Sequence, residues 1–258
     1  MRLKQNNSGV TVSHIRTWAL VCLTVGLVGY CVVLRGILGV REDTTMDTMM
    51  KLFSQEQTRN FLVAVLICQG VYACAVPLFS LLLVEGSFYT RNFSEYLIRT
   101  LAVAVVAEVP FDLATKGVWL DLTTLNPAFG TFFALVMLMF FQRYRDNSAG
   151  SIILRCIVTL AVILWTRMLN VEEGACIVLI TSVLWNFREK PITRLIVSIL
   201  AGLLCWPLFG TFYYVATPLA MILIHFYNHE KGPDFKVGRL VAYPAILALL
   251  ALGCTIAF

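Results

Sequence analysis

The sequence has few charged residues for its length. Only 14% of its 258 residues are Asp, Glu, Lys or Arg, whereas soluble domains carry about 25%. The hydrophobic share is 59% and the mean hydropathy is +0.81. A soluble globule of this size could not hide so much apolar surface, because many of its residues must face water. One or two soluble domains are therefore excluded, and the composition predicts an integral membrane protein.

Metal-binding and disulfide patterns are also lacking. The eight cysteines lie in apolar stretches and form no C-x-x-C pair, so we predict single buried thiols rather than a zinc site or a disulfide framework. Only three histidines occur. His225 and His229 have the i, i+4 spacing of two metal ligands, and Glu230 or Asp234 are the candidates for the third ligand that such a site needs. Interfacial histidines are the favoured interpretation, so we predict no metal site, and we expect no nucleic-acid partner.

Long apolar runs dominate what is present. A transmembrane helix needs about 20 mainly apolar residues, with a range of about 17–25. The sequence predicts an all-α, polytopic transmembrane helix bundle of about nine spans in a single integral membrane domain, 1–258, with a cytoplasmic leader at 1–16 and the bundle at 17–258. The predicted spans are 18–40, 61–84, 97–114, 125–141, 152–169, 174–185, 195–214, 218–227 and 239–258. The sixth and eighth are short enough to be half-helices or re-entrant segments.

The basic residues give this bundle an orientation. Cytoplasmic loops carry an excess of Lys and Arg, and alternate loops here hold thirteen and five of them. The larger set predicts the N-terminus inside and the C-terminus outside; it comprises Arg2, Lys4, Arg16, Arg91, Arg99, Arg143, Arg145, Arg188, Lys190, Arg194, Lys231, Lys236 and Arg239. The smaller set comprises Arg41, Lys51, Arg59, Lys116 and Arg167.

The longest polar stretch, residues 41–60, has two open interpretations. Met46, Met49, Met50 and Phe53 fall at helical spacing, which is typical of an amphipathic surface helix. An ordinary external loop is the alternative.

Two carboxylates occupy the third predicted span. Glu108 and Asp112 stand four residues apart and share one helical face, and Pro110 between them predicts a break that frees backbone groups. Ionisable groups inside a membrane usually face a cavity or a partner. The pair therefore suits a proton relay, a cation site, or a salt bridge to Arg35 or Arg167. Snorkelling to water at the outer end of the span is the remaining alternative.

Other polar residues mark predicted helix ends. Glu85 ends the second span and precedes a basic loop with Arg91 and Arg99, where an arginine suits a phosphate or a carboxylate. No phosphate-cradling Gly-rich loop accompanies them. Asn126 and the pair at 172–173, Glu-Glu, precede the fourth and sixth spans, where they suit N-caps.

A denser pattern lies in the second and third spans. The run VPLFSLLLVEGSFYTRNFSEYLIRT, residues 76–100, followed by EVPFDLA, residues 108–114, resembles the TraX family of polytopic membrane proteins. The matching residues are Pro77, Phe79, Leu82, Glu85, Gly86, Thr90, Arg91, Asn92, Tyr96, Arg99, Glu108, Pro110, Phe111, Asp112, Leu125 and Asn126. The dense match covers residues 76–130, and residues 172–174 match a later family motif more loosely.

The resemblance implies acetyl transfer. The donor is expected to be acetyl-CoA, and the acceptor a membrane or surface polypeptide or an envelope polymer, at a bacterial cytoplasmic membrane. On this basis the candidate catalytic residues are Glu85, Glu108 and Asp112, and the candidate substrate-binding residues are Arg91, Arg99, Asn126 and Tyr243. A bound ligand is to be sought between the first, third and last spans.

Two histidines of the resembled family are missing. Its Asp-His-x-Gly in the first span aligns with Gly26 and Leu27, and its Tyr-Pro-x-His in the last span places Ile246 at the histidine. Histidine is the usual general base, worth about 10²–10⁴-fold in rate, and Glu85 or Glu108 are the candidates to replace it. Three interpretations stay open: an acyltransferase with a degenerate site, a non-catalytic scaffold or binding subunit of an envelope assembly, and a small proton-coupled transporter.

Overall fold

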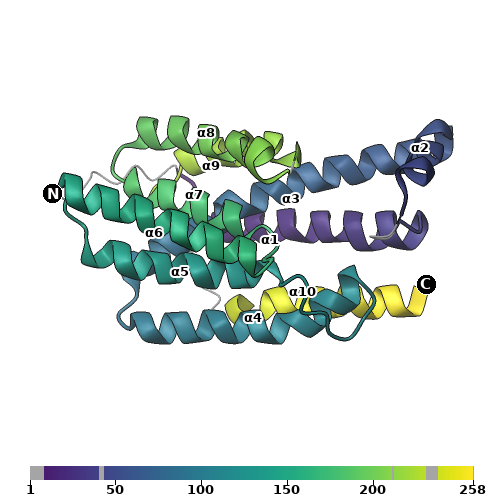
Figure 1. The fold of residues 1–258 in the computed structure, drawn as a ribbon, viewed down its shortest axis with the longest axis horizontal. Coiled ribbons are helices and arrows are strands. Elements are labelled where there is room, and N and C mark those ends of the chain that lie inside the picture. The colour runs from purple at the N-terminus through teal and green to yellow at the C-terminus, as the bar shows by residue number, and fades with distance from the viewer. Residues whose placement is uncertain (1–8, 41–43, 211, 231–237, 258) are drawn as a thin grey trace.

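The computed structural model describes residues 9–40, 44–210, 212–230 and 238–257 (Figure 1). The fold is all-α, with 81% helix, and the described residues form no strand. The helices in chain order are α1 Val12–Val28, η1 Gly29–Ile37, α2 Met46–Ser54, α3 Glu56–Tyr89, α4 Phe93–Thr115, α5 Pro127–Arg143, α6 Ala149–Met168, α7 Gly174–Asn186, α8 Pro191–Phe209, η2 Phe212–Ala216, α9 Thr217–His225 and α10 Gly238–Ala257.

The helical bundle is confirmed, but the count of nine spans is not. Four helices among the described residues are long and apolar enough to cross a bilayer: Val12–Ile37, Glu56–Tyr89, Ala149–Met168 and Pro191–Phe209. The other predicted spans coincide with shorter apolar helical segments, such as Val241–Cys254 within α10, or with α4, which carries four charged side chains. Two of the short ones are those expected to be short, since α7 has 13 residues and α9 has nine.

Proline does not act as the sequence predicted. The predicted break at Pro110 is wrong, because α4 continues through it to Thr115. Likewise α8 includes Pro207 but ends at Phe209, where Gly210 adopts a φ of 80° that favours glycine. The seventh segment is therefore shorter than the predicted 195–214, and a separate 3₁₀ turn follows it.

The polar stretch before the second span contains a helix. Thr45 caps α2 by accepting a hydrogen bond from the backbone N–H of Thr48, at 3.4 Å, and Met50 and Phe53 on α2 are exposed. The helical interpretation is thus confirmed for Met46–Ser54. Several residues used in the predictions lie outside the described residues: Arg2, Lys4, Arg41, Lys231 and Lys236 of the predicted topology, and Asp234, a candidate metal ligand.

The longest helix, α3, organises the core. It packs against α1, α5, α7 and α9, while α4 and α10 lie side by side on the other flank (Figure 1). The α1–α3 approach is close, because Gly26 of α1 lies directly against Tyr72 of α3 and leaves no room for a Cβ atom. Fully buried Leu135, Leu138 and Ile180 from α5 and α7 fill the centre of the bundle.

Candidate functional site

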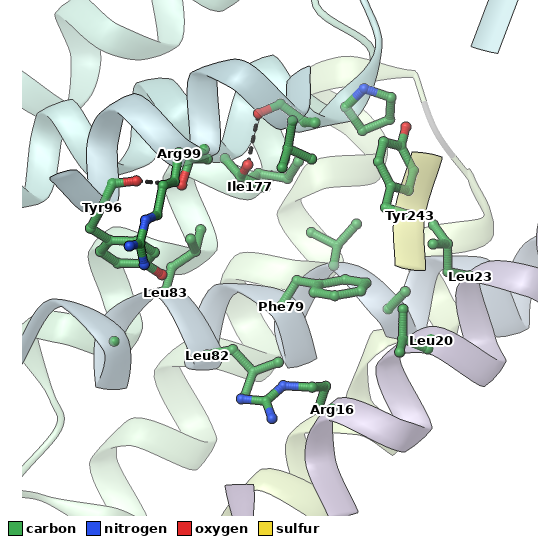
Figure 2. Close-up of a pocket in the computed structure, with 18 of the residues that line it drawn as sticks. Arg16, Leu20, Leu23, Phe79, Leu82, Leu83, Tyr96, Arg99, Ile177 and Tyr243 are labelled. Carbon is green, nitrogen blue, oxygen red and sulfur yellow. Dashed lines mark hydrogen bonds between the residues drawn. The ribbon is translucent and has the colours of Figure 1, made fainter. Parts of the chain in front are cut away.

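A cavity of about 900 Å³ lies between α1, α3, α4, α5 and α10 (Figure 2). It adjoins the first, third and last predicted spans, where a ligand was to be sought. Its lining is part polar and part apolar. Figure 2 shows Arg99 and Tyr96 on one side of the cavity, Phe79 and Leu20 nearer its middle, and Tyr243 on the other side. The cavity is therefore amphipathic.

The polar end is formed by residues from two helix N-termini. Arg99 pairs with Glu95 one turn before it on α4, and Asn92 caps that helix by accepting a hydrogen bond from the Glu95 N–H at 3.2 Å. Gly86 of α3 admits the Tyr96 side chain, because a Cβ there would lie 2.7 Å from the Tyr96 hydroxyl oxygen. Arg16 reaches the same cavity from α1 (Figure 2). Two guanidinium groups thus face the cavity from opposite walls.

The structure brings together only part of the predicted site. Arg99 and Tyr243, both predicted to bind substrate, line the cavity. Arg91 is exposed and Asn126 is buried, and neither belongs to the lining, although Pro127 and Ala128 directly after Asn126 do. The three predicted catalytic carboxylates also lie outside the lining.

Glu85 is held in an ion pair at the end of α3. It is 2% exposed, and its two carboxylate oxygens accept hydrogen bonds from Nε and Nη2 of Arg188 at 2.9 and 3.0 Å. His229 Nδ1 lies 3.6 Å from Oε1 of the same carboxylate. This two-bond geometry is the strong form of a guanidinium–carboxylate contact. Glu85 therefore joins α3 to the turn after α7 and to the segment after α9.

Glu108 and Asp112 have partners other than those predicted. Oε2 of Glu108 accepts hydrogen bonds from the backbone N–H, at 3.2 Å, and the side-chain amide of Asn126. Asp112 is fully buried and lies 3.0 Å from Lys116 Nζ. A structural ion pair is thus present, but the predicted partners were wrong.

The two arginines proposed as partners lie elsewhere. Arg35 is directed to the carbonyl oxygen of Ala114, at 3.4 Å, and the Arg167 guanidinium lies 5.9 Å from the centre of the Phe209 ring. Sequence separation explains the error, because Lys116 stands only one helical turn beyond Asp112 and needs no long-range packing to reach it.

The loop after α4 continues this charged cluster outside the helices. Asp121 lies 3.1 Å from Lys116 Nζ, and its backbone N–H donates to Asp112 at 2.7 Å. Hydrogen bonds from the Thr123 hydroxyl and N–H, together with Lys116, lower the pKa of Asp121 to about 2. Asp121 therefore stays ionised, and its contacts with Lys116 and Asp112 hold the loop against the end of α4.

The two predicted N-caps behave differently. Asn126 caps α5 as predicted, because its Oδ1 accepts the Ala128 N–H at 2.9 Å. Of the pair at 172–173, Glu173 occupies the N-cap position of α7 as predicted, but its side chain makes no capping hydrogen bond. It is a buried acceptor instead, bound by the hydroxyls of Tyr213, at 2.6 Å, and Tyr214. Forty residues separate these partners, and no local signal in the sequence connects them.

The positions of the missing histidines lie in an apolar cluster that shares residues with the cavity wall, although neither position is part of the lining. Leu27 belongs to this cluster with Tyr72 and Phe111, and Ile246 and Tyr243 pack against it. The alignment that located them from sequence therefore identified two positions in the same apolar cluster. Within the described residues, no three His, Cys, Asp or Glu side chains come together as a metal-binding group.

These features define a class of protein: a polytopic helical membrane protein with an amphipathic cavity between its helices. The family model described as TraX protein matches residues 11–253, nearly the whole chain. The chain belongs to the TraX family, which confirms the resemblance read from residues 76–130. Comparison with curated proteins and with solved structures finds no match.

Proposed function

We propose that the chain is a membrane acyltransferase that binds its acyl donor in the cavity between α1, α3, α4 and α10. The observation that carries the proposal is the placement of Arg99 and Tyr243 at opposite ends of one cavity. An arginine is suited to the phosphates of a donor such as acetyl-CoA, and a volume of about 900 Å³ is within the range of small-molecule sites. The charge distribution supports a donor entering from the cytoplasm, with the N-terminus inside and the C-terminus outside a bacterial cytoplasmic membrane.

The reaction needs little from the protein beyond position and a proton acceptor. An amine or hydroxyl of a polypeptide or envelope polymer attacks the thioester carbonyl carbon, the carbon–sulfur bond breaks, and the thiol of coenzyme A takes up the proton that the acceptor loses. Holding the two reactants in line lowers the barrier by itself. Tyr72 and Tyr243, both in the cavity lining, are the tyrosines whose hydroxyls could donate to the thioester carbonyl.

General-base catalysis is the step that the residues around the cavity support least. Leu27 and Ile246 take no proton, and Glu85 is already paired with Arg188. Of the carboxylates suggested as replacements, Glu108 is the better placed, because it stands next to Ala107 of the cluster around Leu27 and its Oε1 atom has no hydrogen-bond partner among the described residues. We expect transfer slower by about 10²–10⁴-fold than in a protein with a histidine base.

A second function is favoured by the same cluster. Leu27, with 5% exposure, and Ile246 place hydrocarbon in this cluster where the family pattern has histidines, which suits a subunit that binds a ligand or a partner without catalysis. Proton-coupled transport has less support, because the pair it would use is divided between separate partners: Glu108 is bound to Asn126, and Asp112 is paired with Lys116.

One experiment separates these functions. Purified protein in lipid nanodiscs is incubated with radiolabelled acetyl-CoA, and both bound and transferred label are measured. We expect binding that Arg99→Gln weakens about tenfold, since a charged hydrogen bond is worth about 1.5–3 kcal/mol. Arg143→Gln, at the exposed end of α5, is the matched control and should leave binding unchanged.

The outcomes are distinct. Transfer that is lost in Glu108→Gln while binding survives supports the acyltransferase. Binding without any transfer supports the non-catalytic subunit. If no acetyl-CoA binds, or if Arg99→Gln and Arg143→Gln behave alike, the proposed function fails.

A further inference from the structure

A second hollow lies on the surface of α1. This groove of about 340 Å³ runs along the helix, lined by Thr17, Leu20, Val21, Thr24 and Val25. Thr17 and Leu20 line both the groove and the cavity. The groove and the cavity are therefore neighbours, separated at most by the side chains of these two residues.

The groove presents an apolar surface although two threonines line it. The Thr17 hydroxyl donates to the carbonyl oxygen of Ser13 at 3.1 Å, and the Thr24 hydroxyl donates to that of Leu20 at 2.8 Å. Both hydroxyls are thus satisfied within the helix, as a group in contact with hydrocarbon must be. Val21 and Trp18 beside them are 45% and 54% exposed. This face of α1 is suited to lipid rather than to water.

Charge and length give the groove a direction. Arg16 lies one residue before Thr17 and one helical turn before Leu20, at the end of α1 where the cavity is polar. From Thr17 to Val25 the helix rises about 12 Å, which is most of one leaflet of a hydrocarbon core about 30 Å thick. The Arg16 cation at one end of the groove therefore complements an anionic headgroup, and the apolar wall beyond it complements the acyl chain of the same lipid.

We infer that α1 binds a membrane lipid with a net anionic phosphate headgroup, which enters the cavity sideways from the bilayer. The phosphate contacts the Arg16 guanidinium, and one acyl chain lies along the groove from Thr17 to Val25. Arginine is suited to phosphate because its planar donors match the phosphate oxygens. The inference goes beyond the proposed function, since lipid binding along α1 holds whether or not the chain transfers acyl groups.

With a lipid bound on α1, the α4 wall of the cavity is available to a second ligand. Arg16 and Arg99 stand on opposite walls of the cavity (Figure 2), so a lipid held on α1 and a water-soluble donor held at Arg99 approach each other inside it. A chain in the groove also covers the cavity beside Thr17 and Leu20, and it thereby keeps the apolar middle of the cavity, around Phe79 and Leu82, out of water.

The test uses a photoactivatable lipid. Full-length protein is placed in phosphatidylcholine nanodiscs that contain a trace of phosphatidylglycerol with a diazirine in one acyl chain, or of phosphatidylcholine with the same chain. After illumination the labelled peptides are mapped by mass spectrometry. We expect the anionic probe to label residues 17–25 about fivefold more than the zwitterionic probe, since one arginine near the surface is worth about 1 kcal/mol.

Two variants and two controls make the result specific. Arg16→Gln should remove the preference for the anionic probe, and Thr17→Trp, at the junction of groove and cavity, should lower labelling by both probes. Ile157→Trp, on the exposed face of α6, and Arg143→Gln should change neither result. Elution as a single monodisperse species verifies folding, and Arg16→Gln decides alone if Thr17→Trp does not fold.

Three results would overturn the inference: equal labelling by both probes, labelling of α1 that survives Thr17→Trp, or a preference that survives Arg16→Gln. None of them bears on acetyl-CoA binding at Arg99, which is measured separately. Failure of the lipid site and failure of the proposed function are thus distinguished.

Discussion

Glu85 of α3 and Arg188, in the turn between α7 and α8, form a two-bond ion pair across 103 residues of sequence, with both N–O distances at or below 3.0 Å. Arg188 also lies over the Phe88 ring, 4.3 Å from its centre. The carboxylate that the sequence suggested as a catalytic acid therefore has a structural environment. Its neighbour Gly86, and not Glu85 itself, reaches the cavity.

The first prediction concerns this pair. Glu85→Gln should lower the free energy of unfolding by about 3 kcal/mol, because it leaves a partly buried guanidinium without its counter-charge. Glu95→Gln is the control, since Glu95 and Arg99 form an exposed pair worth at most about 1 kcal/mol. Equilibrium unfolding in detergent measures both variants. Equal losses would contradict a structural role for Glu85.

The second prediction concerns Asn126. Its side chain donates to Glu108 and to the Ala104 carbonyl, at 2.8 Å for the latter, and accepts the Ala128 N–H. Asn126→Ala should cost about 3 kcal/mol or more, because it removes a helix cap, worth about 1 kcal/mol, and leaves buried acceptors without a donor.

The matched control for Asn126 is the cap of α6. Ser148 accepts the Ser151 N–H at 3.3 Å and is exposed, so Ser148→Ala should lose only the cap itself, about 1 kcal/mol. A loss for Asn126→Ala no larger than for Ser148→Ala would show that the contacts with Glu108 and Ala104 add nothing to stability.

The third prediction concerns pH. The folded-state pKa of Asp121, about 2, lies below its ordinary value of 3.8 because of hydrogen bonds from Thr123 and the charge of Lys116. A lowered pKa stabilises the fold above the unfolded-state value, and this contribution is lost as the pH falls from about 4 towards about 2. Thermal midpoints of the unaltered protein should drop over that range more than those of Asp121→Asn. Identical pH profiles would refute the assignment, and Asp47→Asn on α2 serves as control.

The fourth prediction concerns the missing histidines. Leu27→His together with Ile246→His should raise acetyl transfer by about 10²-fold or more, because imidazoles would then stand in the cluster against which Tyr243 packs. Gly26→Asp should not be added, since a side chain there meets Tyr72, and we expect this third change to prevent folding. No gain in transfer by the folded double variant would favour the non-catalytic subunit.

Local patterns predicted most of the helices. Apolar runs and their flanking caps identify segments such as α3 and α6, because hydrophobic length is a property of neighbouring residues. Pro110 was misjudged, since neighbouring groups in a bundle can absorb a proline that would break an isolated helix. The count of nine spans is not confirmed for a related reason, because hydrophobic length does not decide whether a short helix crosses a bilayer.

Long-range partners could not be predicted. The Glu85–Arg188 pair and the Glu173–Tyr214 contact each depend on how distant helices pack. Only part of the cavity lining was indicated by the sequence. The family-like run contains Gly86, Tyr96 and Arg99, which all line the cavity and stand close in sequence, whereas Arg16 was counted only for its charge.

The most direct test of the cavity as a ligand site is photocrosslinking with a diazirine-bearing acyl-CoA on purified protein, with labelled peptides mapped by mass spectrometry. The account predicts label in residues 13–23, 72–89 and 92–103, the segments of α1, α3 and α4 that line the cavity. Excess unlabelled acetyl-CoA should remove that label, and Arg99→Gln should reduce it about tenfold. Label confined to α6 or α8, or label that acetyl-CoA does not displace, would contradict it.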